Sequence, residues 1–512
     1  MSLSAPSIPH ERLTARPENP ELIRLVGLDD AGEPFLSGDR VLRGIYAGHA
    51  SGVREVLAVC EENDLFRHGL VRTRELASDP HPGIGYETVL EHERVEFVTY
   101  PHEWPASMFK EAARFHVDLF ERLQQHGLTL KDWHPWNVLF VATTPVFVDF
   151  TSVVPIEALS QQTHLAGARS PRGFASRWDS ASIAIYEMYR VMFEPYFGLP
   201  LVMMDRGRHG QARKRLFETT LNAADSVISR REAFADDRTA RLGYELEDRL
   251  LRASLIEKGP VKKRFFSRVR KAIDSRNVAI TSSHYSSYYE EKREAFAAEP
   301  VPEWTNKQRV VHDAIARFTP RTLLDLGSNT GWFSMLAAKM GCSVVAVDLD
   351  EACIDRLFHA AKLEGLSILP LVANLTAPLP ELRARTYADE PARSLIGSDA
   401  PLIQSPVRRL RCEMVLALAV VHHLALGQAH SFTSIASILG DLATRYLCVE
   451  FVSLDDRMIT SDPSFFPAYA AAREDFSWYK QDNFIAALKK HFSTVEALPS
   501  YPDSRTLLIC SK

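Results

Sequence analysis

The sequence predicts an α/β protein with a doubly wound parallel sheet in its C-terminal part, preceded by an α+β unit and a largely helical region. From about residue 280, apolar strands alternate with helices, beginning with "TLLDLG", "GWFSMLAAKMG" and "SVVAVDLD". Upstream, residues 41–105 mix strand patterns with one helical pattern, and residues 155–275 have mainly helical periodicity. At 512 residues the chain is long enough for about three domains.

The composition is that of an ordinary globular protein, with 46% hydrophobic and 24% charged residues and a formal net charge of −5. Such a charge provides no general attraction to nucleic acid or anionic lipid. We find neither an apolar signal region near the N-terminus nor an apolar run of about 18 residues, so we expect no secretory signal and no membrane span. The six cysteines have no metal-binding spacing, and we expect reduced, buried thiols in a cytoplasmic protein.

The first part of the chain is expected to begin with a surface segment, residues 1–40, that is rich in proline and charge. In the α+β unit of residues 41–105, "RVLRGIY", "GLVRTREL" and "RVEFVTY" have strand patterns and "SGVREVLAVCEENDLF" has a helical one. "PHEWP" marks a hinge. The helical region, residues 106–255, opens with "MFKEAARFHVDLFERLQQHG", an amphipathic helix that ends at Gly127.

A basic segment, residues 256–300, follows the helical region. Its stretch 257–276 concentrates Lys and Arg around four apolar residues, namely Phe265, Phe266, Val269 and Ile273. We interpret it as a solvated linker helix between domains. The alternative is a helix that contacts phosphate, RNA or a membrane surface.

The C-terminal domain, residues 301–512, continues the alternation with "ILPLVANL", "EMVLALAVVHHL", a helix near 431–444, "YLCVEFV" and a final strand pair ending in "TLLIC". Residues 377–409 interrupt this rhythm with prolines and mixed charges. We therefore expect an insertion there, either a lid or a disordered loop.

The first predicted strand of this domain runs into the turn Asp325-Leu326-Gly327-Ser328-Asn329-Thr330-Gly331, and a helix follows. Such a turn lets backbone N–H groups approach a nucleotide closely. The next strand ends at Asp348, where a carboxylate can accept hydrogen bonds from both ribose hydroxyls. The turn, the acidic residue at the strand end and the alternation of strands and helices together predict a nucleotide-cofactor site. An ordinary α/β turn is the alternative, and the glycine spacing fits the NAD-binding pattern poorly.

These motifs resemble class I S-adenosylmethionine-dependent methyltransferases, which have a Rossmann-like fold. Asn329 stands where that pattern has its central glycine, and asparagine is the next residue best able to adopt left-handed backbone angles. The resemblance implies that S-adenosylmethionine is the cofactor, with Asn374 near the adenine and Ala419 near the methionyl part. The implied cofactor-binding residues are Asp325, Gly327, Ser328, Asn329, Gly331, Asp348, Leu349, Asn374 and Ala419.

Methyl transfer to oxygen or nitrogen requires an aligned acceptor and usually the removal of a proton. His422 and His423 follow the fourth strand, and we predict that one of them is the general base. Glu450 could orient an imidazole, whereas a metal site of His422, His423 and Glu450 lacks a supporting ligand spacing. Lys307 and "SSYYEEK" are candidates for the cofactor carboxylate, although surface positions are the simpler interpretation.

A second motif lies upstream, where "DWHPWNVLF" is followed by "VFVDF". In phosphotransferases an Asp orients the attacking hydroxyl, an Asn five residues later binds magnesium, and a second Asp binds it too. Asp132, Asn137 and Asp149 fit these three roles. The motif resembles the aminoglycoside phosphotransferase and choline kinase branch of the kinase-like superfamily, which implies magnesium at Asn137 and Asp149 and a bound ATP.

The phosphate clamp of that superfamily is missing from the sequence. Residues 1–109 contain no lysine, and the first one, Lys110, lies in a predicted helix. There is also no glycine-rich phosphate loop. Arg72 or Arg74 could substitute for the lysine, although a guanidinium is not equivalent to an ammonium group. We therefore expect a degenerate, pseudokinase-like site.

The order of these motifs also resembles a bacterial two-part group in which a kinase-like region is fused to a methyltransferase, associated with nodulation factors and surface polysaccharides. We predict a methyltransferase that modifies a hydroxyl of a glycan or secondary metabolite, with a kinase-like domain that binds substrate, nucleotide or a partner. One alternative is a bifunctional enzyme that phosphorylates and methylates its acceptor. The other is a scaffold that binds RNA or a partner through residues 257–276.

Overall fold

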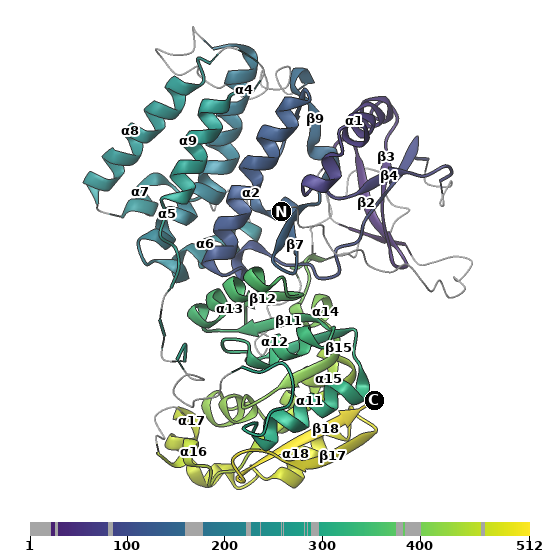
Figure 1. Ribbon diagram of the computed structural model, residues 1–512, viewed down its shortest axis with the longest axis vertical. Coiled ribbons are helices and arrows are strands. Elements are labelled where there is room, and N and C mark those ends of the chain that lie inside the picture. The colour runs from purple at the N-terminus through teal and green to yellow at the C-terminus, as the bar shows by residue number, and fades with distance from the viewer. Residues whose placement is uncertain are drawn as a thin grey trace. The chain divides into compact units, whose positions relative to one another are not determined.

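The computed structural model describes most of the chain (Figure 1). The described residues are 22–25, 29–79, 85–158, 178–221, 227–235, 237–257, 259, 261–280, 282–283, 285–287, 296–374, 382–383, 401–461 and 466–512. The chain forms two compact units: one comprises Met1–Leu57, Arg72–Arg94 and Arg383–Leu402, and the other comprises the remainder.

The first unit contains a five-stranded antiparallel sheet of order β1-β2-β3-β5-β4. Its strands are β1 (Leu22–Arg24), β2 (Gly32–Ser37), β3 (Arg40–Ile45), β4 (Thr73–Glu75) and β5 (Thr88–His92). Phe35, Leu42 and Val89 form its small apolar core.

The expected surface segment ends earlier than residue 40, because β2 buries alternate side chains and pairs with β3. The predicted strand "RVEFVTY" was wrong; the strand lies just before it, at β5.

Helix α1 (Ala50–Glu62) follows β3, as its periodicity predicted. The second unit opens with short elements and one long helix. They are η1 (Leu65–His68), η3 (Pro101–Glu103), α2 (Ala106–Gln125), β6 (Leu128–Leu130), η4 (Pro135–Asn137), β7 (Val138–Val141), β8 (Thr144–Phe147), η5 (Phe150–Ser152) and β9 (Val153–Pro155). Phe120 of α2 stacks on Trp133 with ring centroids 4.5 Å apart, which anchors the chain just after Asp132.

The helical region continues as predicted. Its helices are α4 (Ser180–Met188), the π-helix η8 (Tyr189–Gly198), α5 (Leu199–Asp205), α6 (His209–Leu221), α7 (Arg230–Phe234), α8 (Arg238–Ser254) and α9 (Lys263–Asp274). Aromatic contacts connect them; Trp133, for example, lies 4.9 Å from Phe193 of η8.

Helix α9 is not the solvated linker that the charge pattern suggested. Its apolar residues Phe265 and Phe266 are fully buried, and Phe266 packs on Phe120 of α2. Arg270 forms ion pairs with Asp118 and Glu121 of α2. Because the apolar face is already covered, it cannot enter a membrane, and α9 belongs to the helical region.

The C-terminal domain is built on a seven-stranded sheet of order β12-β11-β10-β15-β16-β18-β17. Its strands are β10 (Thr322–Leu326), β11 (Ser343–Asp348), β12 (Ile368–Val372), β15 (Cys412–Ala417), β16 (Ala443–Val452), β17 (Thr494–Pro499) and β18 (Arg505–Ser511). Strand β18 runs in the opposite direction to the other six strands of this sheet. The chain reverses its winding between β10 and β15, so the sheet is doubly wound, as predicted.

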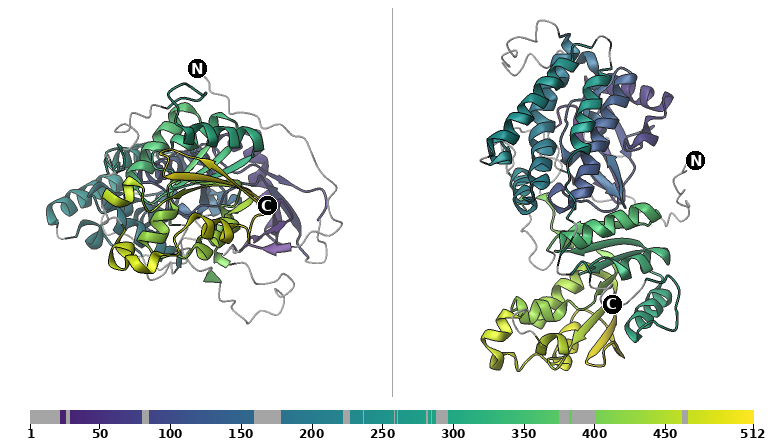
Figure 2. Two further views of the ribbon diagram at one scale, coloured as in Figure 1. Left: turned by 90° about the horizontal axis from the view of Figure 1, so that it is seen from below. Right: turned by 60° about the vertical axis from the view of Figure 1, so that its left-hand side comes forward.

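Helices lie on both faces of this sheet (Figure 2). On one face, α11 (Asn306–Phe318), α12 (Trp332–Lys339) and α13 (Glu351–Glu364) bury a continuous core against the strands. On the other, α15 (Phe432–Leu442) and α18 (Gln481–Leu488) meet through Phe432 and Phe484, whose ring centroids are 4.9 Å apart.

The remaining elements are β13 (Leu382–Arg383), β14 (Pro401–Ile403), α14 (Pro406–Arg409), η10 (His423–Gly427), α16 (Arg457–Ser461), α17 (Pro467–Ala471) and η12 (Arg473–Phe476).

Most of the predicted insertion 377–409 lies outside the described residues. Among the residues that are described, no helix has the length and apolar character needed to cross a lipid bilayer. All six cysteines are buried free thiols, as expected from their apolar surroundings.

Candidate cofactor and acceptor site

The predicted cofactor residues gather at one edge of the seven-stranded sheet. The parallel strands β10, β11, β12 and β15 all end there, and their following loops carry the turn, Asp348, Asn374 and Ala419 in that order. This edge lies beside the point where the winding reverses, which is where open α/β sheets bind ligands.

The turn after β10 depends on left-handed backbone angles. Gly327, Asn329 and Gly331 have φ angles of 75°, 52° and 85°. A Cβ atom on Gly331 would lie 2.4 Å from the side chain of Leu357 in α13. Any residue other than glycine would therefore clash where α12 begins. The N–H groups of Gly327 and Ser328 both donate to the carbonyl of Val347, which fixes the turn against the end of β11.

Asp348 faces this turn from the neighbouring strand. Its carboxylate accepts hydrogen bonds from the backbone N–H of Asn329 at 2.8 Å and of Asp350 at 2.9 Å. Burial raises the pKa of Asp348, although these backbone donors oppose the shift. The hydroxyl of Ser328 is buried beside it without a hydrogen-bond partner. A half-buried acceptor and an unsatisfied buried hydroxyl fit a ligand that carries ribose hydroxyls.

Asp325, in contrast, lies beneath the turn rather than on its open side. It is 2% exposed and accepts a 2.6 Å hydrogen bond from the hydroxyl of Ser334 in α12. Burial raises its pKa from 3.8 to about 6, partly offset by this hydrogen bond. Asp325 therefore joins β10 to α12, and its contribution to a cofactor site is structural.

The raised pKa of Asp325 makes stability depend on pH. The folded state keeps a proton that the unfolded state releases between about pH 4 and 6, so stability falls as the pH rises through this window. Asp325→Asn is neutral at every pH and keeps an oxygen acceptor for Ser334. We expect the variant to gain about 2 kcal/mol relative to the wild type between pH 4 and 7. Urea unfolding at several pH values measures the free energy of unfolding of both proteins. A stability difference that does not change with pH would contradict the raised pKa of Asp325.

His422 and His423 lie after β15, as predicted, but in different environments. His422 is 1% exposed and its Nδ1 atom has no hydrogen-bond partner, whereas His423 is half-buried. Their ring centroids are 4.3 Å apart, and both rings contact Phe466. Burial lowers the pKa of both histidines, and the nearby guanidinium of Arg505 lowers it further. Both imidazoles are therefore neutral near pH 7 and able to accept a proton.

The lowered pKa of His422 is directly testable. We expect the pKa of its imidazole to lie below the usual 6.5, because burial and the neighbouring His423 and Arg505 disfavour the charged form. NMR of protein with labelled histidine monitors the ring protons, and His422→Gln assigns the signal. A titration midpoint near 6.5 for that signal would show that the ring is solvated.

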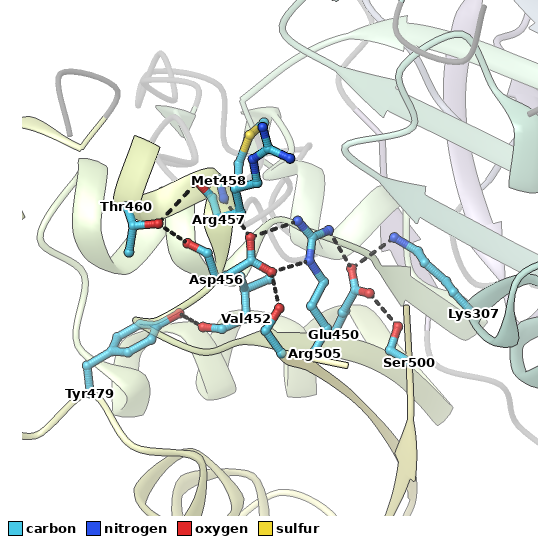
Figure 3. A network of polar contacts seen from close by, with 11 residues as sticks. Lys307, Glu450, Val452, Asp456, Arg457, Met458, Thr460, Tyr479, Ser500 and Arg505 are labelled. Carbon is cyan, nitrogen blue, oxygen red and sulfur yellow. Dashed lines mark hydrogen bonds and ion pairs between the residues drawn. The ribbon is translucent and has the colours of Figure 1, made fainter. Parts of the chain in front are cut away.

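Glu450 does not orient either imidazole, contrary to our expectation. It is completely buried and accepts hydrogen bonds from Lys307 at 2.9 Å and from Ser500 at 2.6 Å (Figure 3). Lys307 is thus not a surface residue, because its side chain is only 15% exposed and pairs with Glu450. Within the described part of the chain, no three His, Cys, Asp or Glu side chains are placed to hold a metal ion, so nothing supports a metal site of His422, His423 and Glu450.

A chain of buried charges continues from Glu450. Arg505, the first residue of β18, lies 3.9 Å from Glu450 and donates two hydrogen bonds to Asp456, at 2.9 and 3.2 Å (Figure 3). Burial alone would raise the pKa of Asp456, but the hydrogen bonds from Arg505 and Ser504 lower it to about 2. We call Lys307, Glu450, Arg505 and Asp456 the buried charge network. The sequence analysis missed Arg505 and Asp456.

The other predicted cofactor residues are more exposed. Leu349 is 61% exposed directly after Asp348, and Asn374 is exposed after β12. Ala419 is half-buried after β15 with a φ angle of 55°, an unusual left-handed angle for alanine. All three lie on loops at the same sheet edge, where a ligand can reach them.

The kinase-like motif also folds into one place. Asp132 follows β6 and Asp149 follows β8, and the hydroxyl of Ser152 lies 3.0 Å from Asp132 and 2.5 Å from Asp149. Asn137 ends η4, and its buried Nδ2 atom has no hydrogen-bond partner. Ser152 was missed by the sequence analysis, although it stands only two residues after the second motif.

Two arginines of the first unit form ion pairs with carboxylates of the same unit. Arg74 lies on β4 and forms an ion pair with Glu91 of β5. Arg43, on β3, is buried and pairs with Asp29 at 2.8 Å.

Together, the doubly wound sheet, the glycine turn and Asp348 define the C-terminal domain as an open α/β domain with a candidate ligand site at one sheet edge. No known family model matches the chain. Nodulation protein NoeA of Rhizobium meliloti (strain 1021) is 25% identical over 480 residues, which are 90% of each chain, so the similarity includes both halves.

Two solved structures show partial likeness. The bifunctional kinase-methyltransferase WbdD is 15% identical over 46% of this chain and 43% of its own, with a TM-score of 0.28. The chain thus matches less than half of the length of WbdD. The N-methyltransferase NodS from Bradyrhizobium japonicum WM9 is 12% identical over 40% of this chain and 94% of its own, with a TM-score of 0.26.

Proposed function

We propose that the chain is an S-adenosylmethionine-dependent methyltransferase. The observation that carries the proposal is the hydrogen bond from the N–H of Asn329 to Asp348, which joins the left-handed turn to an acidic strand end. Asp348 and Ser328 would hold the ribose, and the turn would approach the nucleoside with its backbone. When bound, S-adenosylmethionine supplies the methyl group.

The acceptor would bind at the adjoining loop that follows β15. His423 is the better candidate for the general base, because it is half-buried whereas His422 is 1% exposed. A neutral imidazole at this position takes a proton from an acceptor hydroxyl. We therefore propose O-methylation of a glycan or secondary metabolite, in keeping with the similarity to a nodulation protein.

Isothermal titration calorimetry of the full chain tests the cofactor assignment. We expect S-adenosylhomocysteine to bind with one site per chain and NAD to show no saturable binding. Binding of NAD alone would identify a dinucleotide fold instead, since Asp348 could also hold the ribose of NAD. Binding of neither ligand would contradict the proposed function.

A second function, phosphoryl transfer before methylation, is favoured by one observation. Ser152 connects Asp132 and Asp149, so both predicted phosphotransferase carboxylates converge, and Asn137 offers an unsatisfied amide. Asn137 and Asp149 would hold magnesium with ATP. Phosphoryl transfer would be supported by magnesium-dependent ATP turnover that is lost in Asp149→Ala. The control is Asp64→Ala, at an exposed position, which should keep the turnover. Absence of turnover in the wild type would leave this domain a binding module.

A further inference from the structure

The side chain of Asn329 forms hydrogen bonds that the left-handed backbone angle alone does not explain. Glycine would adopt the φ angle of 52° more readily, yet both polar groups of the asparagine side chain form hydrogen bonds. Its Oδ1 atom accepts a hydrogen bond from the N–H of Thr330 at 2.6 Å, and its Nδ2 atom donates to the carbonyl of Tyr285 at 3.2 Å. The side chain therefore connects the turn to a segment more than 40 residues away.

The segment that Asn329 contacts is held from a second side. Arg356 of α13 donates a 2.7 Å hydrogen bond from its guanidinium to the carbonyl of Ser286, which is 4% exposed. Ser286 is also fixed to Ser283 by a hydrogen bond from the N–H of Ser283 to its hydroxyl, at 2.9 Å. Residues 285–287 are thus attached to two elements of the sheet edge, and we call these residues the clasp.

One attachment point contacts the candidate ribose-binding carboxylate, and the other lies on the helix that follows it. The N–H of Asn329 is bonded to Asp348, and α13, which carries Arg356, is the helix that follows Asp348. The clasp therefore lies where the nucleoside half of a cofactor would approach Asp348. We infer that residues 285–287 close over the ribose and adenine of the bound nucleoside, and that Asn329 is the positioning residue that fastens them. This inference rests on the proposed function.

The clasp explains why asparagine replaces glycine in this turn. A glycine would preserve the backbone conformation but would have no amide to hold Tyr285. A fastened clasp has to open before the nucleoside leaves, so losing the fastening acts mainly on the dissociation rate.

The test is Asn329→Gly, with S-adenosylhomocysteine as the probe. Loss of one neutral hydrogen bond predicts about fivefold weaker binding, expressed mainly as faster dissociation in stopped-flow displacement. Thr319→Gly is the matched control, because Thr319 also has a left-handed φ angle, of 42°, but caps α11 away from the clasp. We expect the control to dissociate at the wild-type rate.

Two further measurements separate positioning from general loosening. Arg356→Met removes the other attachment, and we expect faster dissociation there too. Hydrogen exchange of the clasp amides should rise in Asn329→Gly and stay unchanged in Thr319→Gly. An unchanged dissociation rate in Asn329→Gly, with the wild type binding normally, overturns the clasp. A wild type that does not bind the probe overturns the proposed function instead.

Discussion

Replacing Asp348 with alanine is expected to weaken the binding of S-adenosylhomocysteine by more than about 100-fold. Two charge-assisted hydrogen bonds to the ribose would be lost, and each is worth about 1.5–3 kcal/mol, of which 1.4 kcal/mol corresponds to a factor of ten in affinity. The N–H of Asn329, which now donates to Asp348, would also lose its acceptor. Isothermal titration calorimetry of the purified variant measures this effect.

The matched control for this experiment is Asp313→Ala. The Asp313 side chain lies on α11 and is 76% exposed, so its removal leaves the sheet edge intact. We expect wild-type affinity in the control and a large loss in Asp348→Ala, with both variants folded by circular dichroism. Wild-type affinity in a folded Asp348→Ala protein would exclude the proposed ribose site.

The second large effect is expected for Arg505→Met in the buried charge network. Asp456 would lose two hydrogen bonds and Glu450 a nearby cation, while both carboxylates stay buried. Removing one partner of a buried ion pair costs about 3–5 kcal/mol, because the remaining charge is uncompensated. Urea unfolding monitored by tryptophan fluorescence should show this loss for the C-terminal domain.

Arg317→Met provides the matched control. Arg317 pairs with Glu496 at 3.0 Å, but their side chains are 62% and 50% exposed, so we expect a loss below about 1 kcal/mol. Equal losses in both variants would show that burial does not decide the energy of the network. The acid response should differ too: the stabilisation through Asp456 is present above about pH 4 and is lost as the pH falls toward its pKa of about 2.

The sequence predicted most elements whose apolar pattern is local. The strands β10 and β11, the helix α12 between them and the turn that precedes α12 were confirmed, because a buried parallel strand needs a continuous apolar run and a helix needs its own period. Helix α9 was predicted as a helix, but its burial was not, because the local pattern does not show what packs against it. Its charges are visible in the sequence, whereas the α2 surface that covers its apolar face is not.

The parts of the site that were missed depend on contacts between distant segments. Lys307 and Glu450 are 143 residues apart, and Asp456 and Arg505 are 49 apart, with no periodicity to connect them. Arg505 meets Asp456 because β18 pairs with β16, between β16 and β17, and the sequence predicted β17 and β18 only as a final strand pair. The assignments of the cofactor residues and the general base stay predictions until a ligand is bound.

The burial of every cysteine has a practical consequence. Five of the six thiols, from Cys342 to Cys510, lie in the C-terminal domain, and Cys60 of α1 is the sixth. Burial raises the pKa of Cys60 and Cys353 to about 12, so these thiols are protonated and shielded from alkylating reagents in the native protein. Mass spectrometry of alkylated peptides would then report separately when each half of the chain opens, without an introduced probe.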